Sequence, residues 1–208
     1  MEEFNLLEIT DEISPRYNIP PASDLPVVLN VDNKRHLRFL KWGFVPSWAK
    51  DTTIGQRLIN AKAETILEKP SFRSAFKSRR CIIPANGFYE WKQENKSKQP
   101  YVIKSREDKL LGLAGIWEQW DKQEQLLETC AIITTSPNKL IEPLHNRMPV
   151  IISKTDYAIW LDSATPIEAV HQLLKPYPDE LLTAYPVDRK VGNPRNSDVS
   201  CIQPISSQ

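Results

Sequence analysis

Residues 80–92 read Arg80-Cys81-Ile82-Ile83-Pro84-Ala85-Asn86-Gly87-Phe88-Tyr89-Glu90-Trp91-Lys92. The runs at 81–84 and 88–92 are rich in β-branched and aromatic residues, and this composition predicts two short strands. Further strand-like runs follow at close spacing on both sides. Because strands so close together leave no room for long crossover helices, the pattern predicts a mostly antiparallel α+β fold.

On the two sides of residues 80–92, six more stretches have the composition of strands: 26–31, 37–44, 101–104, 110–120, 129–135 and 148–152. A polar turn at 32–33 joins the first two. Helices are expected at 63–80, with a break at Pro70, around Trp160, and from 165 to 174. We therefore expect a β core with peripheral helices, and the pattern alone leaves open whether the core closes into a barrel.

Composition limits the possible functions. The chain has 208 residues with 40% hydrophobic and 25% charged residues, which fits a single domain spanning residues 1–208. The net charge of +1 means that any nucleic-acid site must be local. No stretch has the length of a membrane span or the form of a signal peptide, so we expect a cytoplasmic protein. Three scattered histidines without metal-ligand spacing predict no metal site and no cofactor.

The cysteines, Cys81, Cys130 and Cys201, are odd in number and far apart. The first two lie inside apolar runs. Free cysteine in such a setting behaves as a small buried hydrophobic residue, and this is the expected state of all three.

Glu90 lies within a strand that is otherwise aromatic on both faces. A carboxyl group in such surroundings loses water, which raises its pKa and suits it to general acid–base catalysis. The alternative is an edge-strand glutamate with its head in water, paired to Lys92 or another neighbour. Spacing alone favours this alternative, because many perturbed carboxyl groups have structural roles.

Two further segments carry residues suited to a site. His145 and Arg147 lie in a loop before a strand, where a histidine can shuttle protons and bind phosphate, or simply hydrogen-bond the loop backbone. Asn60 and Thr65 flank a polar stretch ahead of a helix, where they serve either a site or a helix cap.

Basic and aromatic residues form a third candidate feature. Lys69, Arg73, Lys77 and Arg80 are three or four residues apart, which predicts one basic helical face. This face is either solvated or follows phosphates. Tryptophans such as Trp48 and Trp91 more often fill a core, yet a groove for single-stranded DNA combines cations with aromatic rings.

Taken together, these segments resemble the SOS response-associated peptidase family. The matching motifs occur in the family's order from Arg16 to Pro204. They are Arg16-Tyr17-Asn18-Ile19-Pro20-Pro21, Trp42-Gly43-Phe44-Val45-Pro46-Ser47-Trp48, Asn60-Ala61-Lys62-Ala63-Glu64-Thr65, residues 80–91, His145-Asn146-Arg147-Met148-Pro149 and Val191-Gly192-Asn193. Each motif alone is weak evidence for the family, but the complete set in this order is very specific to it.

The resemblance implies a barrel-like β core and a positively charged channel for single-stranded DNA. Family members react with the aldehyde of an abasic site through an N-terminal cysteine, whose amine and thiol together close a thiazolidine ring. A protease-like self-processing step exposes that cysteine. The expected partners are therefore single-stranded and abasic-site DNA, bound by a monomer that is nucleoid-associated when it holds DNA.

The resemblance assigns catalytic roles to Asn60, which orients the nucleophile, to Glu90 as acid–base carboxyl, and to His145 at the sugar oxygen and phosphate. Lys62 stands where many members have arginine and contacts phosphate as a point charge. The full set of expected DNA contacts is Asn18, Trp48, Lys62, Arg73, Arg80, Trp91, Thr134 and Arg147.

The sequence departs from the family at its start. Members begin Met-Cys-Gly-Arg-Phe, whereas this chain begins Met1-Glu2-Glu3-Phe4, and residues 1–8 resemble the helix that follows the cysteine strand. No internal cysteine can substitute, because the chemistry needs an α-amine and a thiol on one residue. Because Asn60, Glu90 and His145 are all present, we expect a truncated copy of an active protein rather than a degenerate one. Because the cysteine nucleophile is absent, we expect the chain as given to be inactive. An upstream reading frame that encodes the cysteine would distinguish it from the alternative, a non-covalent DNA-binding module. A peptidase acting on other proteins through Glu90 and His145 is a third interpretation, which no nucleophile motif supports.

Overall fold

The computed structural model describes residues 4, 6, 13–95, 97–122 and 124–205. The helix predicted at residues 1–8 therefore lies almost wholly outside the described residues. Within the described part of the chain, no helix has the length and apolar character needed to cross a membrane.

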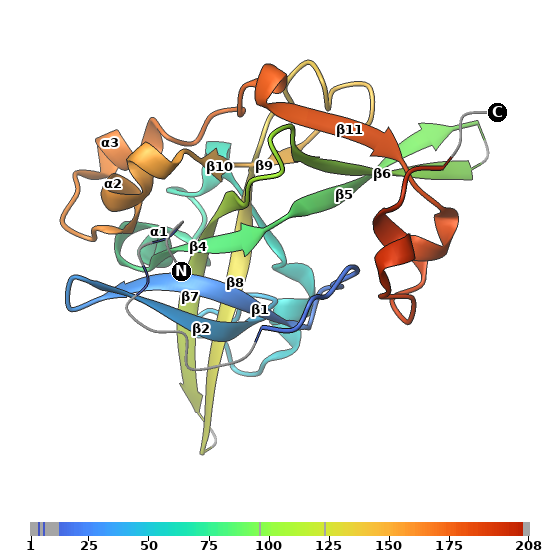
Figure 1. Cartoon of the computed structure of the whole chain (residues 1–208). Helices are drawn as coiled ribbons and strands as arrows, with labels where there is room; N and C mark the ends of the chain where they lie inside the picture. The colour runs from blue at the N-terminus through green and yellow to red at the C-terminus, as the bar shows by residue number, and fades with distance from the viewer. Residues whose placement is uncertain (1–3, 5, 7–12, 96, 123, 206–208) are drawn as a thin grey trace.

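A closed, mixed five-stranded barrel forms the centre of the fold (Figure 1). It consists of β1 (Asp24–Val31), β2 (Lys34–Trp42), β4 (Arg80–Ala85), β7 (Leu111–Lys122) and β8 (Gln125–Thr135). Around the ring, β1 pairs with β4, β4 with β7, β7 with β8, β8 with β2, and β2 with β1. Only the β2–β8 pairing in this ring is parallel. The expected α+β fold with a mostly antiparallel, barrel-like core is confirmed.

Short strands extend the barrel, and a second sheet stands beside it. β3 (Asn60–Lys62) pairs in parallel with β8, β9 (Met148–Pro149) pairs with β8, and β10 (Ile151–Ile152) pairs with β7. The second sheet contains β5 (Gly87–Glu94), β6 (Ser97–Ser105) and β11 (Leu182–Pro186). β6 is its central strand, so β5 is an edge strand of this sheet.

The turn expected between the first two strands is present. Asp32 and Asn33 link Val31 to Lys34, its partner in the ladder. Both turn residues have positive φ, 51° and 60°. A two-residue loop of this kind matches the twist of the flanking strands, and asparagine and aspartate tolerate its left-handed conformation.

Of the barrel strands, β1, β4, β7 and β8 bury residues on both faces, whereas β2 buries only Leu40. One hydrophobic cluster takes residues from all five of them, for example Val27, Leu40, Cys81, Leu113 and Cys130. The alternate residues of the same strands join a second cluster beneath the helices. Because side chains point alternately to the two faces of a strand, apolar runs without a polar alternation indicate this double burial.

The helices lie together on one side of the barrel (Figure 1): α1 (Arg73–Ser78), α2 (Tyr157–Leu161) and α3 (Ile167–His171). Short 3-10 helices complete the structure: η2 (Thr53–Arg57), η3 (Ala63–Thr65), η4 (Lys154–Asp156), η5 (Asp179–Leu181), η6 (Arg189–Gly192) and η7 (Val199–Ile202).

The helices are shorter than the sequence predicts. The stretch 63–80 contains only η3 and α1, because Pro70 disfavours helical geometry in the residue before it and removes a backbone donor. The stretch 165–174 yields only α3, and Pro166 is its N-cap, without a side-chain capping bond. In both stretches a helix is present, but it is shorter than the predicted range.

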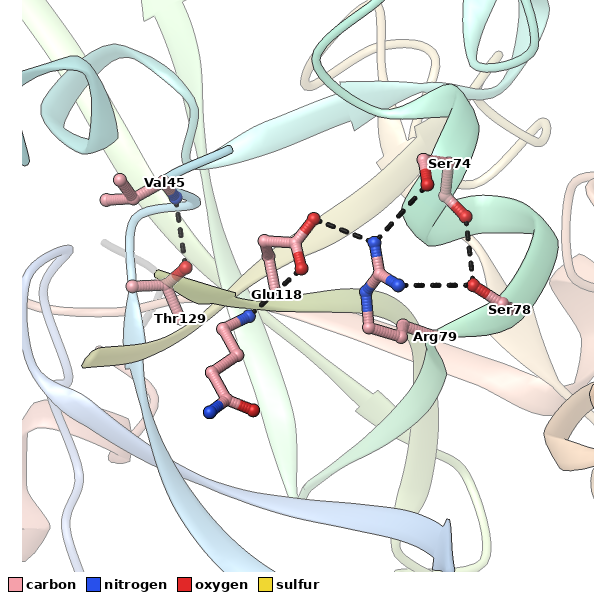
Figure 2. Close-up of polar contacts among 7 residues, drawn as sticks. Val45, Ser74, Ser78, Arg79, Glu118 and Thr129 are labelled. Carbon is pink, nitrogen blue, oxygen red and sulfur yellow. Dashed lines mark hydrogen bonds and ion pairs between the residues drawn. The ribbon is translucent and has the colours of Figure 1, made fainter. Parts of the chain in front are cut away.

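A polar cluster joins α1 to the barrel (Figure 2). Arg79 donates to the carboxylate of Glu118 on β7 at 2.8 Å, and its guanidinium also contacts the Ser74 and Ser78 hydroxyls. Glu118 is 6% exposed. Since a buried carboxylate needs a partner, this ion pair fixes where α1 meets β7.

Candidate functional site

Glu90 owes its position to the place where the chain leaves the barrel. β4 belongs to the barrel and β5 to the second sheet, and Gly87 opens β5. A β-carbon at Gly87 would lie 2.5 Å from the Ile103 carbonyl oxygen on β6. Only glycine allows β5 and β6 to approach this closely. The ladder then sets Glu90 opposite Tyr101.

The Glu90 carboxyl is largely buried and faces a histidine. Its side chain is 16% exposed, and its Oε2 lies 3.4 Å from Nδ1 of His145. Loss of water raises the pKa of Glu90 to about 7, while the charge of His145 and a backbone hydrogen bond from Trp91 act in the opposite direction. Burial thus acts on the pKa of Glu90 in the predicted direction. β5 is an edge strand, as the alternative interpretation expected. Lys92 contacts Glu94 instead.

The His145 loop is anchored by its own residues. The Asn138 side chain donates to the Tyr177 carbonyl at 2.8 Å and accepts from the Ile141 backbone N–H at 3.0 Å. Ile141 is fully buried in the cluster shared by the barrel strands. β9 follows the loop and pairs with the end of β8. The loop is therefore held at both ends while His145 remains exposed.

The main chain of Arg147 holds the imidazole. The Arg147 backbone N–H lies 3.2 Å from Nδ1 of His145, and the Arg147 carbonyl oxygen lies 3.1 Å from the same nitrogen. An unprotonated Nδ1 accepts from the N–H, and a protonated Nδ1 donates to the carbonyl. The ring is thus held in either protonation state.

The side chain of Arg147 is held in turn by Glu64 and β8. Its Nη1 and Nη2 donate to the two carboxylate oxygens of Glu64 at 2.7 and 2.9 Å, and Nη2 also donates to the Thr134 carbonyl at 2.6 Å. These hydrogen bonds lower the pKa of Glu64. In the sequence, Glu64 occurs only within the motif at residues 60–65, and no pattern there predicts a role for it.

β3 presents the remaining polar residues of this region. Asn60 and Lys62 are exposed, and Ala61 between them is buried. Lys62 stands opposite Thr134 in the parallel β3–β8 ladder. The structure therefore brings Lys62 beside the Thr134–Arg147–Glu64 group, and Asn60 lies one strand repeat away on the same face.

Both tryptophans singled out in the sequence are exposed. Trp48 is 56% exposed in the loop after β2, and Trp91 is 38% exposed on β5 next to Glu90. The Trp91 ring also contacts Tyr89, with ring centroids 6.1 Å apart. Large exposed aromatic surfaces are available for stacking. Arg73 is likewise exposed, on α1.

The predicted basic helical face is wrong where Arg80 is concerned. Arg80 belongs to β4 and is 4% exposed. Its guanidinium donates to the carbonyls of Phe76 and Lys77 at the end of α1, and to those of Trp160 and Asp162 at the end of α2. It satisfies backbone groups that helix ends leave unpaired, so it is not available to DNA.

Two other predicted DNA contacts have structural tasks. The Asn18 amide donates to the carbonyls of Val191, Asn193 and Asn196 and so fixes the segment at 191–196. Thr134 is 8% exposed, and its hydroxyl and carbonyl face Arg147. Asn18 and Thr134, like Arg80, therefore make their hydrogen bonds within the protein.

The three cysteines are free and buried, as expected. Burial raises the pKa of Cys81 and Cys201, and raises that of Cys130 to about 12. Because the thiolate is the nucleophilic form, these thiols are chemically inert in the folded protein.

A titration can test the Glu90–His145 geometry directly. We expect the Glu90 side-chain carbon to titrate in NMR spectra with a midpoint near 7. His145→Gln should raise this midpoint further, because it removes a positive charge that favours the ionised carboxylate. A midpoint near the ordinary value of 4.5 would contradict the burial of this carboxyl.

The chain is similar in sequence to a known protein family and to named members of it. The family model described as SOS response associated peptidase (SRAP) matches residues 1–194. The abasic site processing protein YoqW of Bacillus subtilis is 41% identical over 98% of this chain and 93% of its own length. The abasic site processing protein HMCES of Xenopus tropicalis is 30% identical over 94% of this chain and 68% of its own.

Solved structures agree with these sequence relatives. A crystal structure of a protein from Bacteroides thetaiotaomicron superposes with a TM-score of 0.82 and 31% identity, covering 89% of this chain and 82% of that one. A phage-related protein from Bordetella bronchiseptica gives a TM-score of 0.72 at 29% identity, covering 90% and 88%. The chain belongs to the SOS response associated peptidase family.

Proposed function

We propose that this chain is a DNA-damage protein that binds single-stranded DNA around Glu90 and captures abasic sites covalently when a cysteine-bearing segment precedes it. The observation that carries the proposal is the buried Glu90 carboxyl 3.4 Å from His145, with a pKa of about 7. The abasic site processing proteins of Bacillus subtilis and Xenopus tropicalis support the substrate.

The chemistry requires proton transfer near neutral pH. The cysteine amine adds to the sugar aldehyde, and loss of one water gives an imine. The thiol then adds to the imine carbon, and its proton ends on the nitrogen, which completes the thiazolidine. A carboxyl group that titrates near 7 is present in both forms, so Glu90 can protonate the departing hydroxyl and accept a proton from the thiol.

The remaining site residues have supporting roles in this proposal. Asn60 orients the N-terminal amine, and His145 contacts the opened sugar and its phosphate. Lys62 and Arg73 attract the DNA backbone, Trp48 and Trp91 stack on bases, and Arg147 supports His145 because its guanidinium is paired with Glu64. Glu90 is also our candidate for the self-processing step that exposes the cysteine.

A non-covalent DNA-binding module is the second candidate. The observation in its favour is the exposure of Trp48 and Trp91, since stacking needs no nucleophile. Both candidates predict binding to single strands, and they differ in whether an N-terminal cysteine adds a covalent step.

We predict salt-sensitive binding to single-stranded DNA, with duplex bound less well. Trp48→Ala should weaken binding by about 1–3 kcal/mol, because stacking on each aromatic ring contributes roughly that amount. The measurement is fluorescence anisotropy with a labelled oligonucleotide at two salt concentrations. Leu126→Ala, which truncates another exposed apolar residue, serves as the matched control. Equal affinity for duplex, or no dependence on salt, would contradict a stacking groove.

A further inference from the structure

Glu64 and Arg147 form a bidentate ion pair near the site, and the proposed chemistry gives Glu64 no role. The pair is bidentate, with distances of 2.7 and 2.9 Å, and bidentate pairs fix direction as well as distance. The Glu64 side chain is 51% exposed and that of Arg147 only 21%. Glu64 therefore covers the guanidinium from the solvent side.

Arg147 is fixed from the protein side as well. Its Nη2 donates to the Thr134 carbonyl at the end of β8, and its Nε is buried. A guanidinium clamped between a strand end and a carboxylate cannot change rotamer without losing several hydrogen bonds. The Arg147 main chain, which contacts Nδ1 of His145, is consequently fixed too.

We propose that Glu64 is a positioning residue, which acts through Arg147 to hold the His145 imidazole beside the Glu90 carboxyl. The contacts form one chain, from Glu64 to Arg147, from Arg147 to His145 and from His145 to Glu90. The inference deepens the proposed function, because it concerns the same site. Its test uses the free protein without DNA, so either idea can fail without the other.

The test relies on the sign of a change in the Glu90 titration. His145 favours the ionised form of Glu90, so displacement of the imidazole raises the NMR midpoint of Glu90. Removing the negative charge of Glu64 has the opposite direct effect, because a nearby anion disfavours a second anion. Glu64→Gln therefore raises the midpoint if Glu64 positions His145, and lowers it or leaves it unchanged if it does not.

The complete experiment measures the Glu90 midpoint in Glu64→Gln, in His145→Gln and in the double variant. We expect both single changes to raise the midpoint, and the second change to add little to the first, since they act on one contact. Arg147→Lys keeps the charge but loses the bidentate geometry, and should also raise the midpoint. Glu128→Gln, which breaks the surface ion pair with Arg38 at 3.1 Å, is the matched control and should cause no shift.

The same samples show whether a variant has failed to fold or has changed the Glu90 titration. Amide spectra report whether each variant is folded, and Arg147→Lys provides a second route if Glu64→Gln does not fold. An unchanged or lowered Glu90 midpoint in folded Glu64→Gln, with a raised midpoint in His145→Gln, overturns the proposal. Equal shifts of the Glu90 midpoint in Glu64→Gln and Glu128→Gln would overturn it as well. The shift would then come from the loss of any surface carboxylate and not from the contact between Glu64 and Arg147.

Discussion

Placed behind an N-terminal segment that begins Met-Cys-Gly-Arg-Phe, the protein is expected to form a covalent adduct with abasic single-stranded DNA. The adduct should survive a denaturing gel without borohydride, because a thiazolidine does not hydrolyse as an imine does. The segment can be added as an N-terminal extension of the expressed gene. In the proposed mechanism Asn60, Glu90 and His145 serve the new cysteine, so we expect that no other change is needed.

A polypeptide of residues 1–208 should form no stable adduct in the same assay. Its three cysteines are buried and carry no free α-amine. A lysine can form an imine with the aldehyde, but that bond reverses without a reductant. Changing the new cysteine to alanine should also abolish the adduct. A strong adduct from residues 1–208 would refute the N-terminal mechanism, and an inert extended protein would favour the binding module.

The extended protein also tests the acid–base role of Glu90. Glu90→Gln should slow adduct formation by about a hundred-fold or more, the usual contribution of a positioned acid–base group. Glu94→Gln makes the same change on the same strand, at a side chain that is 40% exposed. Equal rates in these two variants would remove Glu90 from the mechanism.

The longer strands could be predicted from the sequence, whereas the three-residue strand β3 and the extents of the short helices could not. Apolar runs bounded by turn residues identify strands such as β4 and β8 wherever both faces are buried. The extent of α1 depends on tertiary contacts instead, because Arg79 and Arg80 turn away to bind Glu118 and the ends of two helices. A cation three or four residues from its neighbours looks the same in sequence whether it faces solvent or caps a buried helix end.

Of the site residues, some could also be found from the sequence and others could not. Glu90 could be found because a carboxyl inside an aromatic strand is unusual by itself. Glu64 could not, because its partner Arg147 is 83 residues away, and the two are brought together by the pairing of both β3 and β9 with β8. Side chains that act alone leave a local signal, whereas side chains that position others depend on long-range contacts.

Glu90→Gln is also expected to stabilise the folded protein at alkaline pH. The pKa of Glu90 is raised from 4.5 to about 7 on folding, so the folded state favours the protonated carboxyl. The stability that this group contributes is fully present below its unfolded pKa, and it is lost as the pH rises through about 7. At about pH 8 the wild-type protein keeps an ionised carboxylate in a poorly solvated place, and glutamine removes that cost.

The size of this effect follows from the pKa shift. A rise from 4.5 to about 7 corresponds to roughly 3 kcal/mol of unfolding free energy between the two protonation states. Urea denaturation at about pH 4.5 and about pH 8 measures it, with Glu94→Gln as the control on the same strand. The advantage of Glu90→Gln over the wild type should grow between the two pH values. A difference that does not depend on pH would mean that the Glu90 carboxyl is solvated in the folded state. If the difference does grow, the residue proposed to drive the chemistry is one that the fold retains at a cost in stability, as expected for a functional carboxyl rather than a structural one.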